Sequence, residues 1–163
     1  MGVDYLLSPV NDEMRAYAVQ TGVLLPEEVP EGRFPTADEL LSVAHSFPEH
    51  QVCRGNSKQG FELTIESDAH VPMEPIPPFK QTSTPASYLD IAVKSFRSDG
   101  AENVSFHGHA DFMVEVIFRL TQTCGGLVFF ATDDALPWFV LPSHKTPIGS
   151  EEWVIFDNNL ENR

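Results

Sequence analysis

Alternation of apolar and polar residues predicts most of the strands in this chain. In the stretch 61–66, the apolar residues Phe61, Leu63 and Ile65 alternate with polar ones, as in a strand with one buried face. The stretch 51–67 therefore predicts a hairpin with this segment as its second arm. Short apolar runs predict further strands at 3–8, 104–108, 127–132, 137–142 and 152–157.

Two helices are predicted within the first fifty residues. Asn11 is a typical helix cap, and Gly22 follows as a stop. A second helix begins at Thr36, because Thr36 and Glu39 form a capping box in which each side chain satisfies a free backbone N–H group. The proline-punctuated residues 24–35 predict a loop between these helices.

The longest predicted helix, at about 110–124, lies between two predicted strands. If both strands join one sheet, the connection is expected to be a right-handed parallel crossover. The preceding stretch 84–98 fits either a strand or a helix. Apolar residues at alternate positions fit a strand, and we favour the strand because turn residues follow the stretch.

These elements together predict a single α+β domain spanning 1–163. The expected architecture is a mixed, mostly antiparallel sheet with about three helices mainly on one face, including a β-α-β unit at 104–132. A proline-rich stretch at about 70–87 predicts a stiff connecting loop. Its apolar residues either cover the domain's own surface or dock on a partner, and self-packing is favoured.

Charge restricts the ligands that this chain can bind. It holds 10 Lys and Arg against 24 Asp and Glu, a net charge of −14 at pH 7. Nucleic acids and anionic membranes need clustered cations, so neither is expected as a direct ligand. No apolar run approaches the ~18 residues of a membrane helix, and the N-terminus lacks a basic region, which predicts a cytoplasmic protein. Cys53 and Cys124 are then reduced thiols, although a disulfide between them stays open.

Acidic residues are concentrated near the N-terminus, where the first fifty residues hold nine acids and two bases. An acidic surface attracts a basic partner, so the sequence predicts a non-catalytic protein-binding module without a cofactor. A homodimer through an exposed strand edge is a further possibility. The predicted partner-binding residues are Glu27, Glu28, Glu31, Asp38 and Glu39.

In size and charge the chain resembles small acidic immunity proteins, which neutralise bacterial toxins, and is similar to other nucleic-acid-mimicking inhibitors. This likeness implies a bacterial inhibitor of a basic protein. It is a likeness of class that no motif carries, so it implies no residue roles.

The alternative function is a small metal-dependent enzyme or metal-binding protein that uses His107, His109 and Asp111. Two imidazoles and a carboxylate at alternate positions suit zinc. The stretch resembles the H-x-H-x-D-H signature of the metallo-β-lactamase hydrolases, but Phe112 stands where that signature has its last histidine. Only His144 follows as a histidine, which argues against that family. The competing interpretation is a joint between a strand and a helix, with Asp111 at the positive end of the helix dipole.

Other candidate residues have structural interpretations that we prefer. Asp133 and Asp134 suit a hairpin turn better than a magnesium site. His50 and Cys53 have a spacing that allows a catalytic pair, but a small buried thiol is the expected role of Cys53. Aromatic residues around Trp138 and Trp153 are expected to be exposed and available to a partner.

Overall fold

The described part of the chain contains eight strands and three helices. The computed structural model describes residues 4–48, 50–56, 60–67, 87–97, 100–132 and 136–149. The strands are β1 (Tyr5–Pro9), β2 (Gln51–Asn56), β3 (Phe61–Ser67), β4 (Ser87–Arg97), β5 (Gly100–Gly108), β6 (Leu127–Ala131), β7 (Pro137–Leu141) and β8 (His144–Ile148). The helices are α1 (Asp12–Thr21), α2 (Ala37–Ala44) and α3 (Ala110–Cys124).

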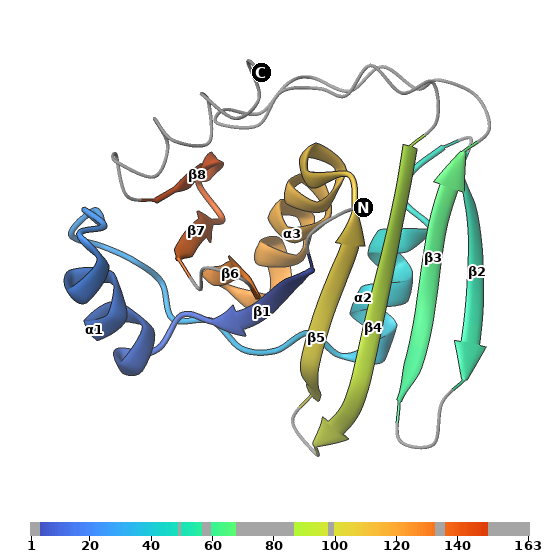
Figure 1. Cartoon of the computed structure of the whole chain (residues 1–163), viewed down its shortest axis with the longest axis horizontal. Coiled ribbons are helices and arrows are strands. Elements are labelled where there is room, and N and C mark those ends of the chain that lie inside the picture. The colour runs from blue at the N-terminus through green and yellow to red at the C-terminus, as the bar shows by residue number, and fades with distance from the viewer. Residues whose placement is uncertain are drawn as a thin grey trace.

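The described strands form one sheet in the order β2-β3-β4-β5-β1-β6-β7-β8 (Figure 1). Every neighbouring pair in it is antiparallel. Because β1 is antiparallel to both β5 and β6, the latter two strands run parallel to each other, with α3 connecting them. The predicted β-α-β unit is therefore present, with β1 inserted between its two strands.

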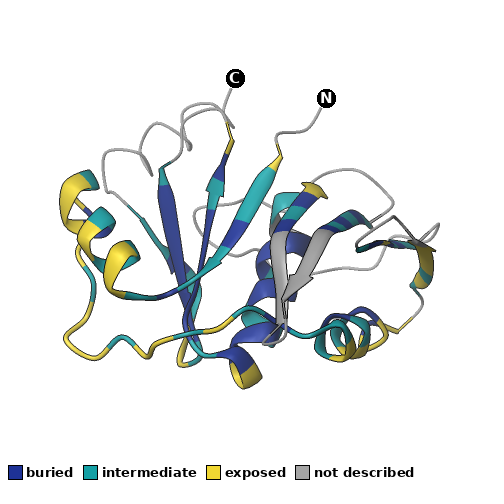
Figure 2. Ribbon diagram, turned by 90° about the horizontal axis from the view of Figure 1, so that it is seen from below, coloured by how far each residue is buried: buried dark blue, intermediate teal, exposed yellow. Residues whose placement is uncertain are grey.

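The sheet has a different helix layer on each face. Phe129 and Trp138 pack in the large core with α2 and α3, whereas their neighbours Val128 and Phe139 pack with α1. This division follows from the alternation of side chains along a strand. Helix α3 is largely buried and α1 largely exposed, as the colours in Figure 2 show. Two of the three helices thus share one face, and the predicted α+β class is confirmed.

Both predicted ends of α1 and the predicted start of α2 are confirmed. The Asn11 side chain accepts a hydrogen bond from the Met14 backbone N–H at 2.8 Å, and Gly22 ends α1 with a φ of 78°. A glycine suits that position because other residues rarely adopt a positive φ. Thr36 and Glu39 form the expected capping box at the start of α2.

Three of the strands either settle what the sequence left open or differ from what it indicates. The stretch that fitted both a strand and a helix is strand β4, with Leu89, Ile91 and Val93 buried in alternation. The expected exposure of aromatic residues at Trp138 is wrong, because β7 is buried on both faces and Trp138 has no exposed surface. Strand β8 was not predicted, since its sequence His-Lys-Thr-Pro-Ile lacks an apolar pattern.

Several predictions fall outside the described residues. These are the strand at 152–157 with Trp153, the turn residues Asp133 and Asp134, and nearly all of the proline-rich stretch at 70–87. Of the helices that are described, none combines the length and apolarity that a membrane crossing requires.

Candidate functional site

The two histidines of the predicted metal motif have different partners. His107 is exposed on β5, and its Nδ1 lies 2.8 Å from Oδ1 of Asp4. His109 precedes α3, and its Nδ1 accepts a hydrogen bond from the Tyr88 backbone N–H at 3.2 Å. That ring nitrogen is therefore occupied within the fold. Asp111 is the second residue of α3, and its side chain lies outside the description.

The backbone between these histidines requires a glycine. Gly108 has a φ of 145°, and a Cβ atom there would come within 2.5 Å of the Tyr88 carbonyl oxygen. Glycine thus allows β5 to end against β4 while His109 turns into the helix. Among the described residues, no group of three His, Cys, Asp or Glu side chains is placed to hold a metal ion. The metal hypothesis thus lacks a ligand set in this part of the chain.

A polar cluster lies on the sheet face opposite α2 and α3. Asp90 accepts hydrogen bonds from the Thr64 hydroxyl, at 2.7 Å, and from the Tyr88 hydroxyl. The hydrogen bond to Asp90 raises the pKa of Tyr88 to about 12, with burial adding to the effect. Because a raised pKa keeps the phenol protonated at neutral pH, Tyr88 is not an activated base or nucleophile. The cluster is best explained as cross-strand pairing that ties β3 to β4.

The two cysteines form no disulfide, and they differ in exposure. Cys53 is exposed and free on β2, so the buried role expected for it is wrong. Cys124 is buried at the end of α3, and this burial raises the pKa of its thiol. His50 lies against the rings of Phe47 and Phe112, with centroids 5.9 and 5.1 Å away.

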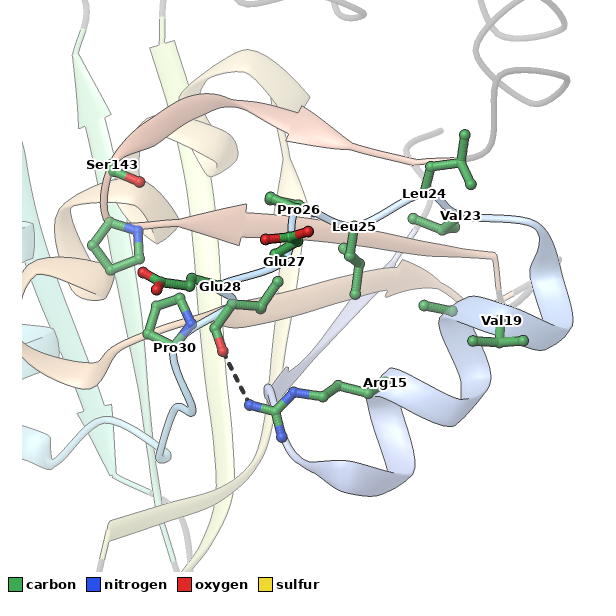
Figure 3. Close-up of a pocket in the computed structure, with 13 residues that line it drawn as sticks. Arg15, Val19, Val23, Leu24, Leu25, Pro26, Glu27, Glu28, Pro30 and Ser143 are labelled. Atoms are coloured by element: carbon green, nitrogen blue, oxygen red, sulfur yellow. Dashed lines mark hydrogen bonds between the residues drawn. The ribbon is translucent and has the colours of Figure 1, made fainter.

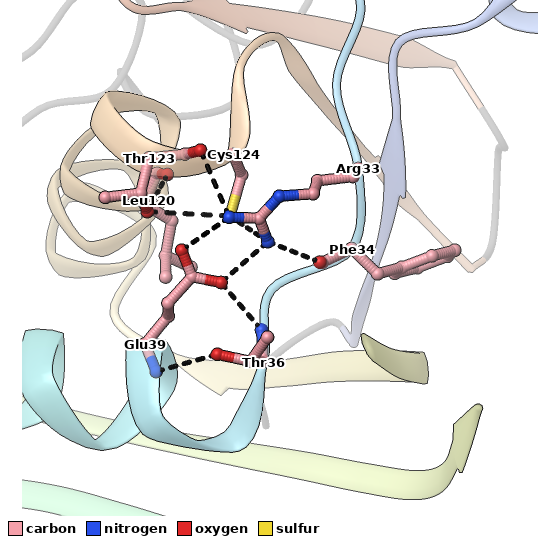
Figure 4. Close-up of polar contacts among 7 residues, drawn as sticks. All are labelled: Arg33, Phe34, Thr36, Glu39, Leu120, Thr123 and Cys124. Carbon is pink, nitrogen blue, oxygen red and sulfur yellow. Dashed lines mark hydrogen bonds and ion pairs between the residues drawn. The ribbon is translucent and has the colours of Figure 1, made fainter. Parts of the chain in front are cut away.

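One of the predicted partner-binding acids, Glu39, belongs to an internal ion pair. Its two carboxylate oxygens accept hydrogen bonds from the two Nη atoms of Arg33, at 2.7 and 2.8 Å (Figure 4). Oε1 also accepts from the Thr36 backbone N–H at 2.9 Å. These bonds, the Arg33 bond foremost, hold the pKa of Glu39 well below its usual range. Only 18% of the Glu39 side chain is exposed, so its main role is to join the 24–35 loop to α2.

A hollow of about 1080 Å³ lies between α1, the loop that follows it and the turn between β7 and β8 (Figure 3). We call it the α1 hollow. Its apolar lining includes Val19 and Leu24, whose exposed fractions are 81% and 82%. No other large hydrophobic residue in the described part of the chain is so exposed. The lining residues are Arg15, Ala18, Val19, Val23, Leu24, Leu25, Pro26, Glu27, Glu28, Val29, Pro30, Pro142 and Ser143.

Acidic side chains edge the α1 hollow. Glu27 and Glu28 are exposed and belong to its lining. The one cation of the lining, Arg15, is already engaged: it bonds to Asp12 and to the Val29 carbonyl oxygen, each at 3.0 Å. Glu31 lies 3.8 Å from the same guanidinium. The carboxylates of Glu27 and Glu28 therefore leave a net negative potential over an apolar surface.

The structure thus divides the five predicted acids into separate groups. Glu27 and Glu28 line the hollow, Glu31 pairs with Arg15, and Asp38 is exposed on the first turn of α2. The sequence did not indicate Val19 and Leu24 as surface residues. The only available signal was that Val19 lies off the helix face that Met14 and Ala18 share.

Comparison with known proteins gives no relative for this chain: no family model, no curated protein and no solved structure matches it. Any function assigned to it must therefore rest on its own residues.

Proposed function

We propose that the protein is a non-catalytic binding module that recognises a basic protein partner through the α1 hollow. The observation that carries this proposal is the pairing of two highly exposed apolar side chains, Val19 and Leu24, with the carboxylates of Glu27 and Glu28 in one hollow. Exposed apolar surface next to charge is characteristic of interaction sites.

The partner's chemistry follows from this surface. Apolar side chains of the partner enter the hollow beside Val19 and Leu24, and Lys or Arg side chains pair with Glu27 and Glu28. Burial of the apolar groups supplies affinity, whereas the charges guide association and select for a basic partner. Inhibition of a basic protein, as immunity-type proteins do, is the form of this function that the net charge of −14 favours.

The proposal is tested by selecting peptides from a random display library against the purified protein. We expect the selected peptides to combine Lys or Arg with apolar residues, and Glu27→Lys/Glu28→Lys to weaken their binding. Each exposed ion pair contributes about 0.2–1 kcal/mol, so reversing two charges should weaken binding by roughly tenfold. Leu24→Ser tests the apolar contribution without a change in charge.

A matched control separates a specific site from general attraction to an acidic protein. Glu62→Lys/Glu66→Lys makes the same change of charge on β3, away from the hollow. We expect this control to bind the selected peptides as the unmodified protein does. Selection of no peptide, or equal weakening by both charge reversals, would overturn the proposal.

A further inference from the structure

The two edge strands of the described sheet differ in how well they are protected from pairing with a strand of another molecule. Strand β8 contains Pro147 and Lys145, and its pairing with β7 is irregular between Phe139 and Leu141. Prolines, lysines and irregularities are the usual devices that keep an edge from pairing with another chain. Strand β2, at the opposite end of the sheet, has none of them within Gln51–Asn56.

Strand β2 is also regular enough to template another strand. It pairs with β3 in unbroken register, from Gln51 opposite Glu66 to Asn56 opposite Phe61. The only described strand next to it is β3, so its other side has no partner among the described strands. An edge of this kind offers backbone N–H and C=O groups to an incoming strand.

The charges of β2 favour a second copy of this chain over a basic partner. The protein holds 24 acidic residues, yet none lies between Gln51 and Asn56. The single charge on the strand is that of Arg54, whose guanidinium lies 4.8 Å from the centre of the Phe61 ring. A basic partner would therefore find no carboxylate on this strand, whereas two acidic copies could approach there with little repulsion.

Neighbouring strands lie about 4.8 Å apart, so the Glu62 and Glu66 carboxylates on β3 would stand about 10 Å from the added strand. At that separation, physiological salt screens most of the repulsion between exposed charges.

We propose that β2 pairs antiparallel with β2 of a second copy, around a twofold axis, and joins the two sheets into one. Such an isologous contact is the commonest form of homodimer. Because the axis would be perpendicular to the sheet, α2 of each copy would lie on the same face. The α1 hollows would lie at the two far ends, since Figure 1 shows α1 and β2 at opposite ends of the sheet. This inference does not depend on what the hollow binds.

Sedimentation velocity over a concentration series tests the proposal, with reducing agent present so that a Cys53 disulfide cannot create a dimer. We expect the mass to rise from 18.1 kDa towards twice that value. Cys53→Glu/Gly55→Glu would place like charges opposite each other and should raise the dissociation constant by about tenfold or more. Both positions have room for the new side chain, because Cys53 is exposed and a Cβ at Gly55 meets nothing within 4 Å; since Gly55 lies opposite Glu62, circular dichroism is used to check that the variant stays folded.

The matched control is Ser143→Glu/His144→Glu, which adds two acids at exposed positions of the other sheet edge. His144 is the first residue of β8, and Ser143 precedes it. We expect it to dimerise as the unmodified protein does. Hydrogen exchange of the unmodified protein gives a second measurement that needs no variant: amides of Gln51–Asn56 should gain protection as the concentration rises. A constant mass of 18.1 kDa overturns the proposal. So does a dimer whose dissociation constant is unchanged by the β2 substitutions and whose β2 amides gain no protection.

Discussion

Replacing Glu39 with glutamine tests whether this residue stabilises the fold. The substitution keeps the size and one acceptor oxygen but removes the charge that meets both Nη atoms of Arg33 at 2.7 and 2.8 Å. Hydrogen bonds to charged groups contribute about 1.5–3 kcal/mol each. Arg33 is 48% exposed, so water replaces much of the loss. We therefore expect the free energy of unfolding to fall by about 1–2 kcal/mol, which lowers the Tm by about 2–8 °C for a chain of this size.

The effect of Glu39→Gln should depend on pH. Since the pKa of Glu39 is lowered in the folded protein, its stabilising contribution is present above the unfolded pKa of 4.5 and is lost as the pH falls towards the folded value. The difference in stability between the unmodified protein and Glu39→Gln should then be largest at neutral pH and shrink below pH 4.5.

Urea unfolding followed by circular dichroism at neutral and acidic pH measures this difference. The control is Asp38→Asn, which removes an exposed charge one residue away and should change the stability by about 0.5 kcal/mol or less. Equal losses for Glu39→Gln at both pH values, or no loss at neutral pH, would refute the assignment. Glu39 would then return to the set of candidate partner-binding residues.

Two further predictions concern packing and thiol chemistry. Gly32→Ala should destabilise the protein by about 1–3 kcal/mol in the same assay, because a Cβ there would lie 1.8 Å from the Gly126 carbonyl oxygen. The control Gly55→Ala should leave the stability nearly unchanged, and similar stabilities of the two variants would contradict this packing. A thiol reagent should label Cys53 rapidly in the folded protein and Cys124 only after unfolding, since Cys124 is buried and its pKa is raised. Rapid labelling of a Cys53→Ala variant would show that Cys124 is accessible.

The sequence correctly predicted those elements that depend on interactions between residues close together in the chain. The capping box of Thr36 and Glu39 and the alternation around Phe61 depend on residues close in the sequence, and both are found as predicted. The β-α-β unit was predicted because an apolar helix pattern separates two apolar runs. The insertion of β1 between its strands was not predictable, since strand order depends on contacts between residues about a hundred positions apart.

The candidate site was less predictable than the fold. Charge counting indicated Glu27 and Glu28 but also selected Glu39, because the sequence does not show that Arg33 and Glu39 meet. Trp138 was misjudged because nothing in the local sequence shows that α3 covers its strand. The α1 hollow itself arises from three segments that meet only in the folded chain.

The most direct test of the proposed function is an NMR titration of labelled protein with a synthetic peptide of alternating arginine and leucine. The account predicts chemical shift changes centred on Val19, Leu24, Glu27 and Glu28, which weaken at high salt and are largely lost in Glu27→Lys/Glu28→Lys. Glu62→Lys/Glu66→Lys should keep them. Changes centred on other surfaces, or changes that survive the reversal at Glu27 and Glu28, would contradict recognition through the α1 hollow.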